Sequence, residues 1–366
     1  MAHSLSRSSV LPGDRHAFPT TPAPTRGAPV LHPDAPNPAD VARAGSAPPL
    51  AREHLDRDAV SRPDEQRAAA FDADANARVL AVHAGRVLVV EAEAADGAPR
   101  LELRHPSTLP EPDVRCYLGR TLDAGADATG DALPAGSPIE AWTYGADASA
   151  AIAEESRWAG LRRIATSLDD RDAGLAIEAV ALANWHATHA FCASCGSPTE
   201  VVSSGWARRC LAEDRLRFPR TDPAVIVVVT DDEDRVLLGS NAMWEQDRFS
   251  VLAGFVEPGE SLEAAVVREL VEETGLAVDR VEYLGSQPWP FPASLMCAFR
   301  ARVAHGASTV PVPDGEEILE LRWFDRDGLR AALGRVALPG ETSIARWMLE
   351  EWYGGPLASS MPWSTS

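Results

Sequence analysis

Apolar residues along this chain recur with two different spacings, and the change between them predicts where strands and helices lie. Before Asn76 there is little apolar periodicity. Beyond it, runs in which apolar residues alternate with polar ones predict strands, and apolar residues three and four apart predict helices. These segments are the strands Arg78–Val82, Arg86–Glu91 and Leu101–Leu103 and the helices Ser149–Leu168 and Ala173–His186. They predict an N-terminal α+β domain over residues 66–187.

A second series of strands follows a short insert, rich in Cys, Gly and Arg, at residues 188–222. Its first member, Ala224–Thr230, is an unbroken run of mostly β-branched residues, typical of a strand buried on both faces. Further strands are predicted at Val236–Leu238, Phe249–Leu252, Val281–Ser286, Leu295–Val303 and Leu319–Phe324, and helices at Leu262–Thr274 and Ser343–Glu351. Residues 223–354 should therefore form a mixed sheet flanked by helices.

Composition adds expectations about the tails and the compartment. Ten prolines in residues 1–50 predict a disordered tail over residues 1–65, and residues 355–366 are expected to be flexible. No apolar run is long enough to span a membrane, and no secretory signal is recognisable. We therefore expect a cytoplasmic protein with no membrane partner.

The charge balance excludes several mechanisms. The formal net charge is −20, and all 34 basic residues are arginines. An acidic surface argues against a general nucleic-acid binder, and the lack of lysine excludes Schiff-base and P-loop lysine chemistry. An anionic substrate must therefore be met by metal ions or arginines. Five cysteines, an odd and sparse set, do not indicate a disulfide framework.

One acidic segment fits that requirement. Glu269, Glu272 and Glu273 stand at positions i, i+3 and i+4 of a predicted helix, so their carboxylates should project on one side. Clustered carboxylates repel one another unless hard divalent cations such as Mg²⁺ or Mn²⁺ bind them. Arg268 is expected to pair with an upstream carboxylate, Glu260.

The stretch from Gly254 to Leu276 resembles the catalytic box of Nudix hydrolases, G-x5-E-x7-R-E-U-x-E-E-x-G-U, in full. A solvated acidic helix face is the alternative, but it does not account for all the matching positions. The resemblance implies an α/β (α+β) fold, namely a Nudix α/β/α sandwich preceded by a zinc-ribbon insert and the N-terminal α+β domain. It also implies metal-dependent hydrolysis of a diphosphate bond, in which the catalytic and metal-binding set includes Arg268, Glu269, Glu272 and Glu273.

A proline-rich aromatic segment narrows the substrate. Trp289 and Phe291 stand between prolines, which predicts a rigid aromatic ledge for flat heteroaromatic rings. The alternative is a loop that packs its aromatics into the core. The segment is similar to the SQPWPFPxS array of NudC-type NAD(H) pyrophosphatases, which implies NADH or NAD⁺ as the substrate and NMN(H) and AMP as the products. The implied substrate contacts are Gln287, Pro288, Trp289, Pro290, Phe291, Pro292, Ala293 and Ser294.

The same resemblance implies further site residues. Glu317 takes the position of an additional metal-binding Glu, and Ala253 that of a backbone carbonyl ligand. Glu272 and Glu317 are both candidates for the general base. A homodimer is also implied. The positions of the remaining substrate contacts are taken by Phe218, Phe255, Ala345 and Arg162.

The insert resembles a zinc ribbon with one departure. Cys192 and Cys195 form a CxxC knuckle, and Cys210 begins the second pair, but Glu213 stands where the last cysteine is expected. A Cys3Glu structural zinc site is chemically reasonable, because carboxylate oxygen is also a zinc ligand. The alternatives are a ribbon that has lost its metal, or a fourth ligand drawn from Asp214, His186 and His189.

Other functions stay open at this point. One is hydrolysis of another nucleoside diphosphate derivative such as ADP-ribose, and another is a non-catalytic Nudix module that senses a nucleotide. NudC-type enzymes also remove NAD caps from RNA 5′ ends, so NAD-capped RNA is a further expected partner. The basic residues that could guide a short 5′ end are Arg208, Arg209, Arg215, Arg217 and Arg220.

Overall fold

The structure is a computed structural model that describes residues 47–90, 99–127 and 130–358. The predicted N-terminal tail falls mostly outside these residues, but residues 47–65 are ordered, so that part of the prediction is wrong. Leu50 is 1% exposed, and its backbone N–H donates to Gln287 Oε1 over 3.0 Å. Burial of Leu50 and Leu55, together with pairing of Leu55 with Thr121, holds a segment that lacks periodicity. Of the predicted C-terminal tail, Leu357 is also buried, and residues 359–366 lie outside the described part.

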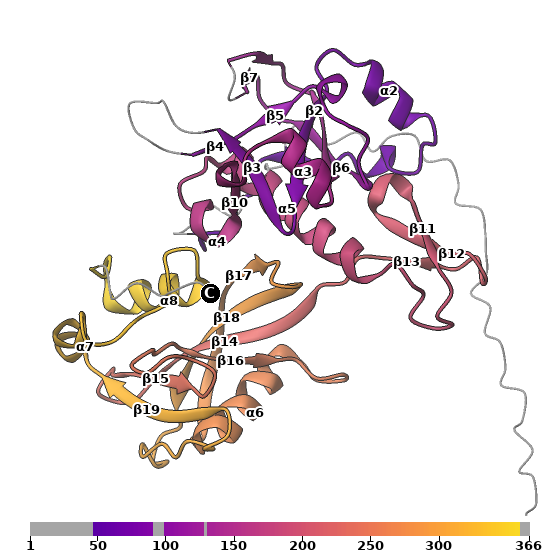
Figure 1. The fold of residues 1–366 in the computed structure, drawn as a ribbon. Coiled ribbons are helices and arrows are strands. Elements are labelled where there is room, and N and C mark those ends of the chain that lie inside the picture. The colour runs from indigo at the N-terminus through magenta and orange to yellow at the C-terminus, as the bar shows by residue number, and fades with distance from the viewer. Residues whose placement is uncertain (1–46, 91–98, 128–129, 359–366) are drawn as a thin grey trace, which may run out of the picture. The chain divides into compact units, whose positions relative to one another are not determined.

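An eight-stranded sheet forms the N-terminal domain (Figure 1). Its main path runs β1, β6, β9, β2, β3, β10, while β5 pairs with β2 and β4 with β3. The β2–β9 pair is parallel, and β6 and β9 were not predicted from the sequence. The strands are β1 (Leu55–Asp56), β2 (Arg78–His83), β3 (Arg86–Val90), β4 (Arg100–Leu101), β5 (Leu103–Arg104), β6 (Val114–Thr121), β9 (Pro138–Thr143) and β10 (Trp158–Gly160), and β7 (Gly125–Ala126) and β8 (Ala132–Leu133) form a separate pair.

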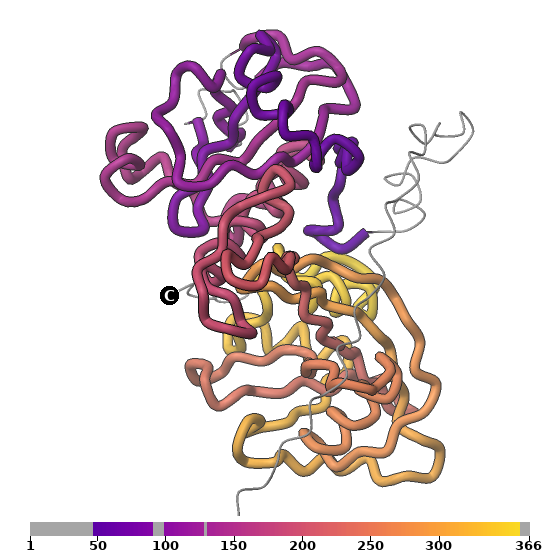
Figure 2. Tube along the Cα trace, turned by 90° about the vertical axis from the view of Figure 1, so that its right-hand side faces the viewer, coloured from indigo at the N-terminus to yellow at the C-terminus, as the bar shows by residue number. Residues whose placement is uncertain are grey.

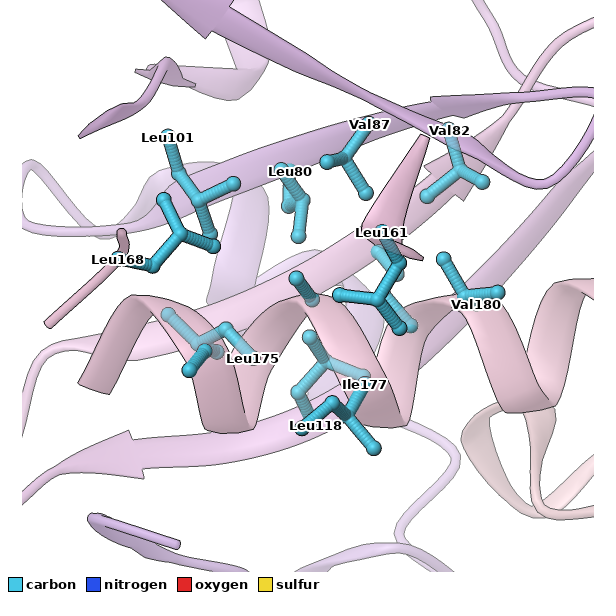
Figure 3. Packing of buried hydrophobic residues seen from close by; sticks show 14 of the residues in the cluster. Leu80, Val82, Val87, Leu101, Leu118, Leu161, Leu168, Leu175, Ile177 and Val180 are labelled. Atoms are coloured by element: carbon cyan, nitrogen blue, oxygen red, sulfur yellow. The ribbon is translucent and has the colours of Figure 1, made fainter. Parts of the chain in front are cut away.

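Helix α5 (Asp170–Thr188) packs on this sheet and confirms the helix predicted at Ala173–His186. It begins where the Asp169 side chain accepts a hydrogen bond from the Asp172 N–H, a standard N-cap. Its apolar residues pack against buried residues of the strands, as Figure 3 shows for Leu175, Ile177 and Val180. The shorter helices are α2 (Arg67–Ala73), α3 (Ala146–Ile152) and α4 (Leu161–Ile164).

The single helix predicted over Ser149–Leu168 is wrong. Helix α3 ends at Ile152, and Trp158–Gly160 instead forms strand β10, which pairs antiparallel with β3. Trp158 and Ala159 are both buried in this arrangement. Pairing with an existing sheet edge overrides the local helical spacing, because it supplies hydrogen bonds and burial that the sequence pattern alone does not reveal.

The insert after α5 is a small antiparallel sheet. Its three strands run in the order β11 (Thr199–Val202), β12 (Ala207–Cys210) and β13 (Leu216–Arg217). None of the described helices has the length and apolar content that crossing a membrane requires.

A six-stranded mixed sheet forms the C-terminal domain. Its path runs β17, β18, β14, β15, β19, with β16 paired to β14, and only the β14–β18 pair is parallel. The strands are β14 (Asp222–Thr230), β15 (Val236–Asn241), β16 (Leu252–Phe255), β17 (Val278–Trp289), β18 (Ser294–Val303) and β19 (Ile318–Phe324). The strand predicted at Phe249–Leu252 is therefore displaced, because only Leu252 belongs to β16.

Helices cover both faces of this sheet (Figure 1), and the orange to yellow part of the tube in Figure 2 belongs to this domain. Val225, Val227 and Val229 of β14 belong to the core beneath α6 (Leu262–Thr274). Ile226 and Val228 point to the opposite core, which holds α7 (Arg326–Ala332) and α8 (Ile344–Tyr353). Alternate residues of one strand thus enter two cores, which confirms the strand buried on both faces and the α/β/α sandwich.

Candidate functional site

Helix α6 carries the three predicted carboxylates, but it does not expose them equally. Ser261 caps its N-terminus, and Gly275 ends it with a φ of 67°, a left-handed conformation that suits glycine. The Glu272 side chain is 61% exposed and that of Glu269 15%, whereas Glu273 is 4% exposed as a residue. The three carboxylates therefore differ in exposure: Glu272 faces solvent, Glu269 is mostly covered, and Glu273 is buried.

Arg268 ties the loop before α6 to the helix. Its Nε and Nη2 donate to the two Glu260 carboxylate oxygens over 2.9 and 3.0 Å, and Nη2 also donates to the Phe255 carbonyl over 2.9 Å. The predicted Arg268–Glu260 pair is confirmed, and it lowers the pKa of Glu260. Nη1 lies 2.9 Å from Glu269 Oε1 and 3.2 Å from Glu272 Oε2. A single guanidinium therefore orients three carboxylates of the box.

Gly254 explains why the box requires a glycine at its first position. The residue lies in β16, paired with Val225 of β14, and a Cβ there would overlap the Glu269 carboxylate. Any side chain would push that carboxylate away from the strand. The lack of a side chain at Gly254 thus leaves room for the Glu269 carboxylate beside the backbone of this residue.

Glu273 is the most perturbed carboxylate of the site. Burial, followed by the nearby charges of Glu269, Glu317, Asp314 and Glu272, raises its pKa to about 8, and burial likewise raises the pKa of Glu269. Glu273 Oε2 is buried and has no hydrogen-bond partner among the described residues. A buried oxygen without a partner, facing further carboxylates, fits a divalent cation with oxygen ligands such as Mg²⁺ or Mn²⁺.

Glu317 is held by two residues that sequence reasoning missed. Asp314 Oδ1 accepts hydrogen bonds from the backbone N–H groups of Glu316, Glu317 and Ile318, over 2.8 to 3.1 Å. Asn241 Nδ2 donates to Glu317 Oε1 over 3.3 Å. An Asp followed by Gly is a turn signal that could have indicated the first contact, whereas the second joins residues far apart in the sequence.

A cavity of about 620 Å³ gathers many of the predicted residues. Its lining includes carboxylates from α6 and from the turn before β19, the aromatic segment, and two arginines of α4 in the N-terminal domain. The predicted residues that line it are Arg162, Ala253, Glu273, Trp289, Glu317 and Ala345, and the lining residues that were not predicted include Arg163, Thr166 and Arg248. Three distant parts of the chain therefore build a single concave site, the usual form of a small-molecule site.

The aromatic segment is only partly arranged as predicted. Trp289 and Phe291 meet edge to face with ring centroids 5.0 Å apart, and the Arg162 guanidinium lies 5.4 Å and 4.3 Å from the two rings. Gln287 does not line the cavity and is 0% exposed. Its amide accepts from the Leu50 N–H and donates to the Thr342 carbonyl, each over 3.0 Å, so its structural role is to join segments.

The rest of the predicted substrate contacts lie elsewhere. Pro288, Pro290, Ala293 and Ser294 line a neighbouring cavity of about 680 Å³, which Trp289 also lines. Phe218 and Phe255 are 65% and 59% exposed and line neither cavity. The role of both phenylalanines as base-stacking residues stays a prediction.

The ribbon gathers the four predicted zinc ligands. One ligand atom each from Cys192, Cys195, Cys210 and Glu213 lies within 4.8 Å of all the others. Arg217 Nη2 donates to Cys192 Sγ over 3.1 Å, lies 3.4 Å from Glu213 Oε2, and lowers the pKa of Cys192 to about 6. Thiolate and carboxylate donors at this spacing fit a structural Zn²⁺ ion.

The two histidines considered as alternative zinc ligands are not part of this cluster. His186 is buried, and its ring nitrogens contact the Gly205 carbonyl and Arg208 Nη1. Burial lowers its pKa to about 4, so it stays neutral. His189 contacts the Trp185 carbonyl. Neither histidine belongs to the cluster, in which Glu213 stands beside the three cysteines.

Comparisons with known proteins divide the chain at the same places. Residues 220–347 match the NUDIX domain, residues 187–218 the NADH pyrophosphatase zinc ribbon domain, and residues 76–185 the NADH pyrophosphatase-like rudimentary NUDIX domain. Three successive matches thus cover the catalytic sheet, the ribbon and the N-terminal sheet.

Several curated proteins are similar in sequence. The NAD-capped RNA hydrolase NudC of Mycobacterium bovis BCG is 46% identical over 202 residues, which are 52% of this chain and 64% of that protein. The protein of the same name from Stutzerimonas stutzeri is 41% identical over 53% of this chain and 67% of its own length. NAD-capped RNA hydrolase NUDT12 of Macaca fascicularis is 36% identical over 50% of this chain and 42% of its own. The chain thus spans slightly less than two thirds of the mycobacterial relative.

Proposed function

Because the chain belongs to the NudC-type family of Nudix hydrolases, we propose that it hydrolyses the diphosphate bond of NADH or NAD⁺ to NMN(H) and AMP. The observation that carries the proposal is the cavity that joins Glu273 and Glu317 to Trp289 and Arg162. One part of the cavity wall carries carboxylates that suit metal ions, and another carries an aromatic side chain beside an arginine. Such a wall suits a substrate that combines a diphosphate with a flat ring.

The proposed mechanism assigns a task to each part of the site. Mg²⁺ or Mn²⁺, when bound, polarises the phosphoryl oxygens and lowers the pKa of the attacking water. Glu269, Glu273, Glu317 and the Ala253 carbonyl would hold the metal, and Arg268 keeps Glu269 in place. Trp289 and Arg162 orient the ring-bearing half of the substrate. Hydrolysis is an in-line displacement at phosphorus, for which positioning and charge stabilisation provide most of the catalysis.

Two carboxylates remain candidates for accepting a proton from water. Glu317 lines the cavity, whereas Glu272 is 61% exposed and pairs with Arg268. Glu272→Gln and Glu317→Gln variants separate them, because loss of the base flattens the alkaline rise of kcat with pH, whereas loss of a metal ligand mainly raises the metal concentration needed.

The decisive test is product analysis with NADH. Wild type in Mg²⁺ or Mn²⁺ should release AMP and reduced NMN, and Glu273→Gln should lower kcat at least about 100-fold, as expected for loss of a metal-holding group. Glu263→Gln removes the same charge from an exposed position of α6 and serves as the matched control. Faster turnover of ADP-ribose than of NADH would favour another Nudix activity, and no metal-dependent AMP release at all would favour a nucleotide-sensing module.

Removal of NAD caps from RNA is a second proposed activity, supported by the names of the similar proteins. The basic residues near the ribbon lend it less support than the sequence suggested. Arg208 is buried against His186, Arg209, Arg217 and Arg220 face carboxylates, and among the described residues only Arg215 of this group has no partner. Intact NAD-capped RNA alongside consumed NADH would refute this activity.

We also propose a cytoplasmic homodimer. Phe218 and Phe255 are 65% and 59% exposed, and burying these large apolar side chains against a second copy of the chain would stabilise a dimer. Sedimentation equilibrium of wild type and of a Phe218→Ser, Phe255→Ser double variant measures the oligomeric state. A monomeric wild type would refute the dimer.

A further inference from the structure

Helix α4 brings two adjacent arginines, Arg162 and Arg163, to the wall of the catalytic cavity. The protein carries a net charge of −20, and most of its described arginines face carboxylates in ion pairs such as Arg67–Glu140 and Arg78–Asp127. Neither guanidinium of the α4 pair has a hydrogen-bond acceptor or an ion-pair partner among the residues that the structure describes. Because both line the catalytic cavity, these two uncompensated cations offer hydrogen-bond donors and positive charge to an anion that enters it.

The two arginines are not equivalent. The Arg162 guanidinium lies over the rings of Phe291 and Trp289, and its backbone carbonyl accepts a hydrogen bond from Thr342 Oγ1 over 3.3 Å. Arg163 makes no such contact within the described residues and is exposed to the cavity. Thr166 lines the same wall and adds a hydroxyl group. All N–H groups of the Arg163 guanidinium are therefore available to donate hydrogen bonds to a ligand.

The diphosphate by itself does not require this cation. Its charge is met by the divalent metals that the carboxylates Glu269, Glu273 and Glu317 would hold, and Arg162 already adds a cation beside the aromatic rings. A guanidinium and a hydroxyl group on the wall are hydrogen-bond donors that suit a phosphate, which accepts a bidentate hydrogen bond from arginine.

Resting on the proposed function, we infer that Arg163 and Thr166 bind a phosphate that the substrate carries in addition to its diphosphate, on the ribose of the adenosine half. Two sources share this chemistry. One is a 2′-phosphomonoester, as in NADPH, and the other is the 3′-phosphodiester that joins an NAD cap to the next nucleotide of RNA. Arg163 thereby sets substrate preference without taking part in bond cleavage.

The first test compares kcat/KM for NADH, NADPH and a short NAD-capped RNA in wild type, Arg163→Ala and Arg163→Lys. Loss of a charge-assisted bidentate contact should lower kcat/KM at least about tenfold for one phosphate-bearing substrate and less than about threefold for NADH. Arg163→Lys should recover part of the lost kcat/KM, since lysine keeps the positive charge but cannot donate the two parallel hydrogen bonds of a guanidinium. Arg300→Ala removes the same charge from an exposed position of β18 outside the cavity and should leave all three values unchanged.

The second test measures binding directly and does not depend on turnover. Isothermal titration with 5′-AMP, adenosine 2′,5′-bisphosphate and adenosine 3′,5′-bisphosphate identifies which phosphate position gains affinity, and that gain should vanish in Arg163→Ala. The inference is overturned if neither bisphosphate binds more tightly than AMP to wild type, or if Arg163→Ala lowers all three substrates in parallel. Failure of wild type to hydrolyse NADH would instead refute the proposed function, and the binding comparison would still decide the role of Arg163.

Discussion

Replacing Glu273 by Gln should stabilise the metal-depleted protein, and the gain should grow with pH. Glu273 is 4% exposed, and burial raises its pKa to about 8 from its ordinary value of 4.5. A carboxyl group with a raised pKa binds its proton more tightly in the folded state, so folding free energy is lost as pH rises from the unfolded pKa to the folded one. Glutamine resembles the protonated carboxyl group and is insensitive to pH in this range.

The expected size of the stability gain follows from how much of the interval between the unfolded and the folded pKa the chosen pH range covers. Between pH 6 and pH 8 the wild type loses about 2.3 kcal/mol of unfolding free energy, because the slope of about 1.36 kcal/mol per pH unit falls to half at the folded pKa, and it loses only about 0.4 kcal/mol more between pH 8 and pH 9. This value is a ceiling, because the pKa of Glu273 depends on the charge of Glu269, whose own pKa is also raised. Mg²⁺ should abolish most of the difference, since a bound cation favours the ionised carboxylate.

The assay is urea unfolding of wild type and Glu273→Gln at pH 6 and pH 9, followed by tryptophan fluorescence. Mg²⁺ and Mn²⁺ are removed with an ion-exchange resin, because a soluble chelator would also strip the ribbon. Glu272→Gln, a neighbouring position that is 61% exposed, is the control and should show no gain that grows with pH. If the unfolding free energies of wild type and Glu273→Gln change in parallel from pH 6 to pH 9, ionisation of the buried Glu273 carboxylate does not destabilise the fold, and the reasoning is refuted.

Three further outcomes follow from the contacts of the site. Gly254→Ala should lower kcat for NADH at least about 100-fold while the unfolding midpoint changes little, because its Cβ displaces the Glu269 carboxylate rather than a core residue; retained activity in steady-state assays would contradict this. Asp314→Ala should raise the Mg²⁺ concentration for half-maximal rate about tenfold, because it removes the oxygen that accepts the backbone hydrogen bonds of the turn. Asp314→Asn keeps an accepting oxygen and should not raise it. If the two variants need the same Mg²⁺ concentration, the turn does not hold Glu317. Glu213→Ala should lower the zinc content of the purified protein, measured by metal analysis. Glu213→Cys should bind zinc more tightly, measured as resistance to a colorimetric chelator. An unchanged zinc content in Glu213→Ala would show that the fourth ligand is another residue.

Much of the catalytic half was predictable, because its signals are local. The positions of Glu269, Glu272 and Glu273 on one helix follow from helical spacing, and β14 follows from an unbroken apolar run. The Arg268–Glu260 pair could also be anticipated, since both residues belong to the same motif. The N-terminal half was less predictable. Residues 47–65 and strand β10 gain their structure from partners far along the chain, which periodicity does not report.

The sequence by itself determined the chemistry of this protein: a carboxylate helix that needs divalent metal, a ribbon of three cysteines and a glutamate, and an aromatic segment between prolines. Only the tertiary structure decided how each group is used. It buries Glu273 and exposes Glu272 on the same helix, turns Gln287 into a link between segments, and lays Arg162 and Arg163 of another domain along the catalytic cavity. Motif spacing is set by bonds along the chain, whereas burial, pKa and access depend on what packs across from each side chain.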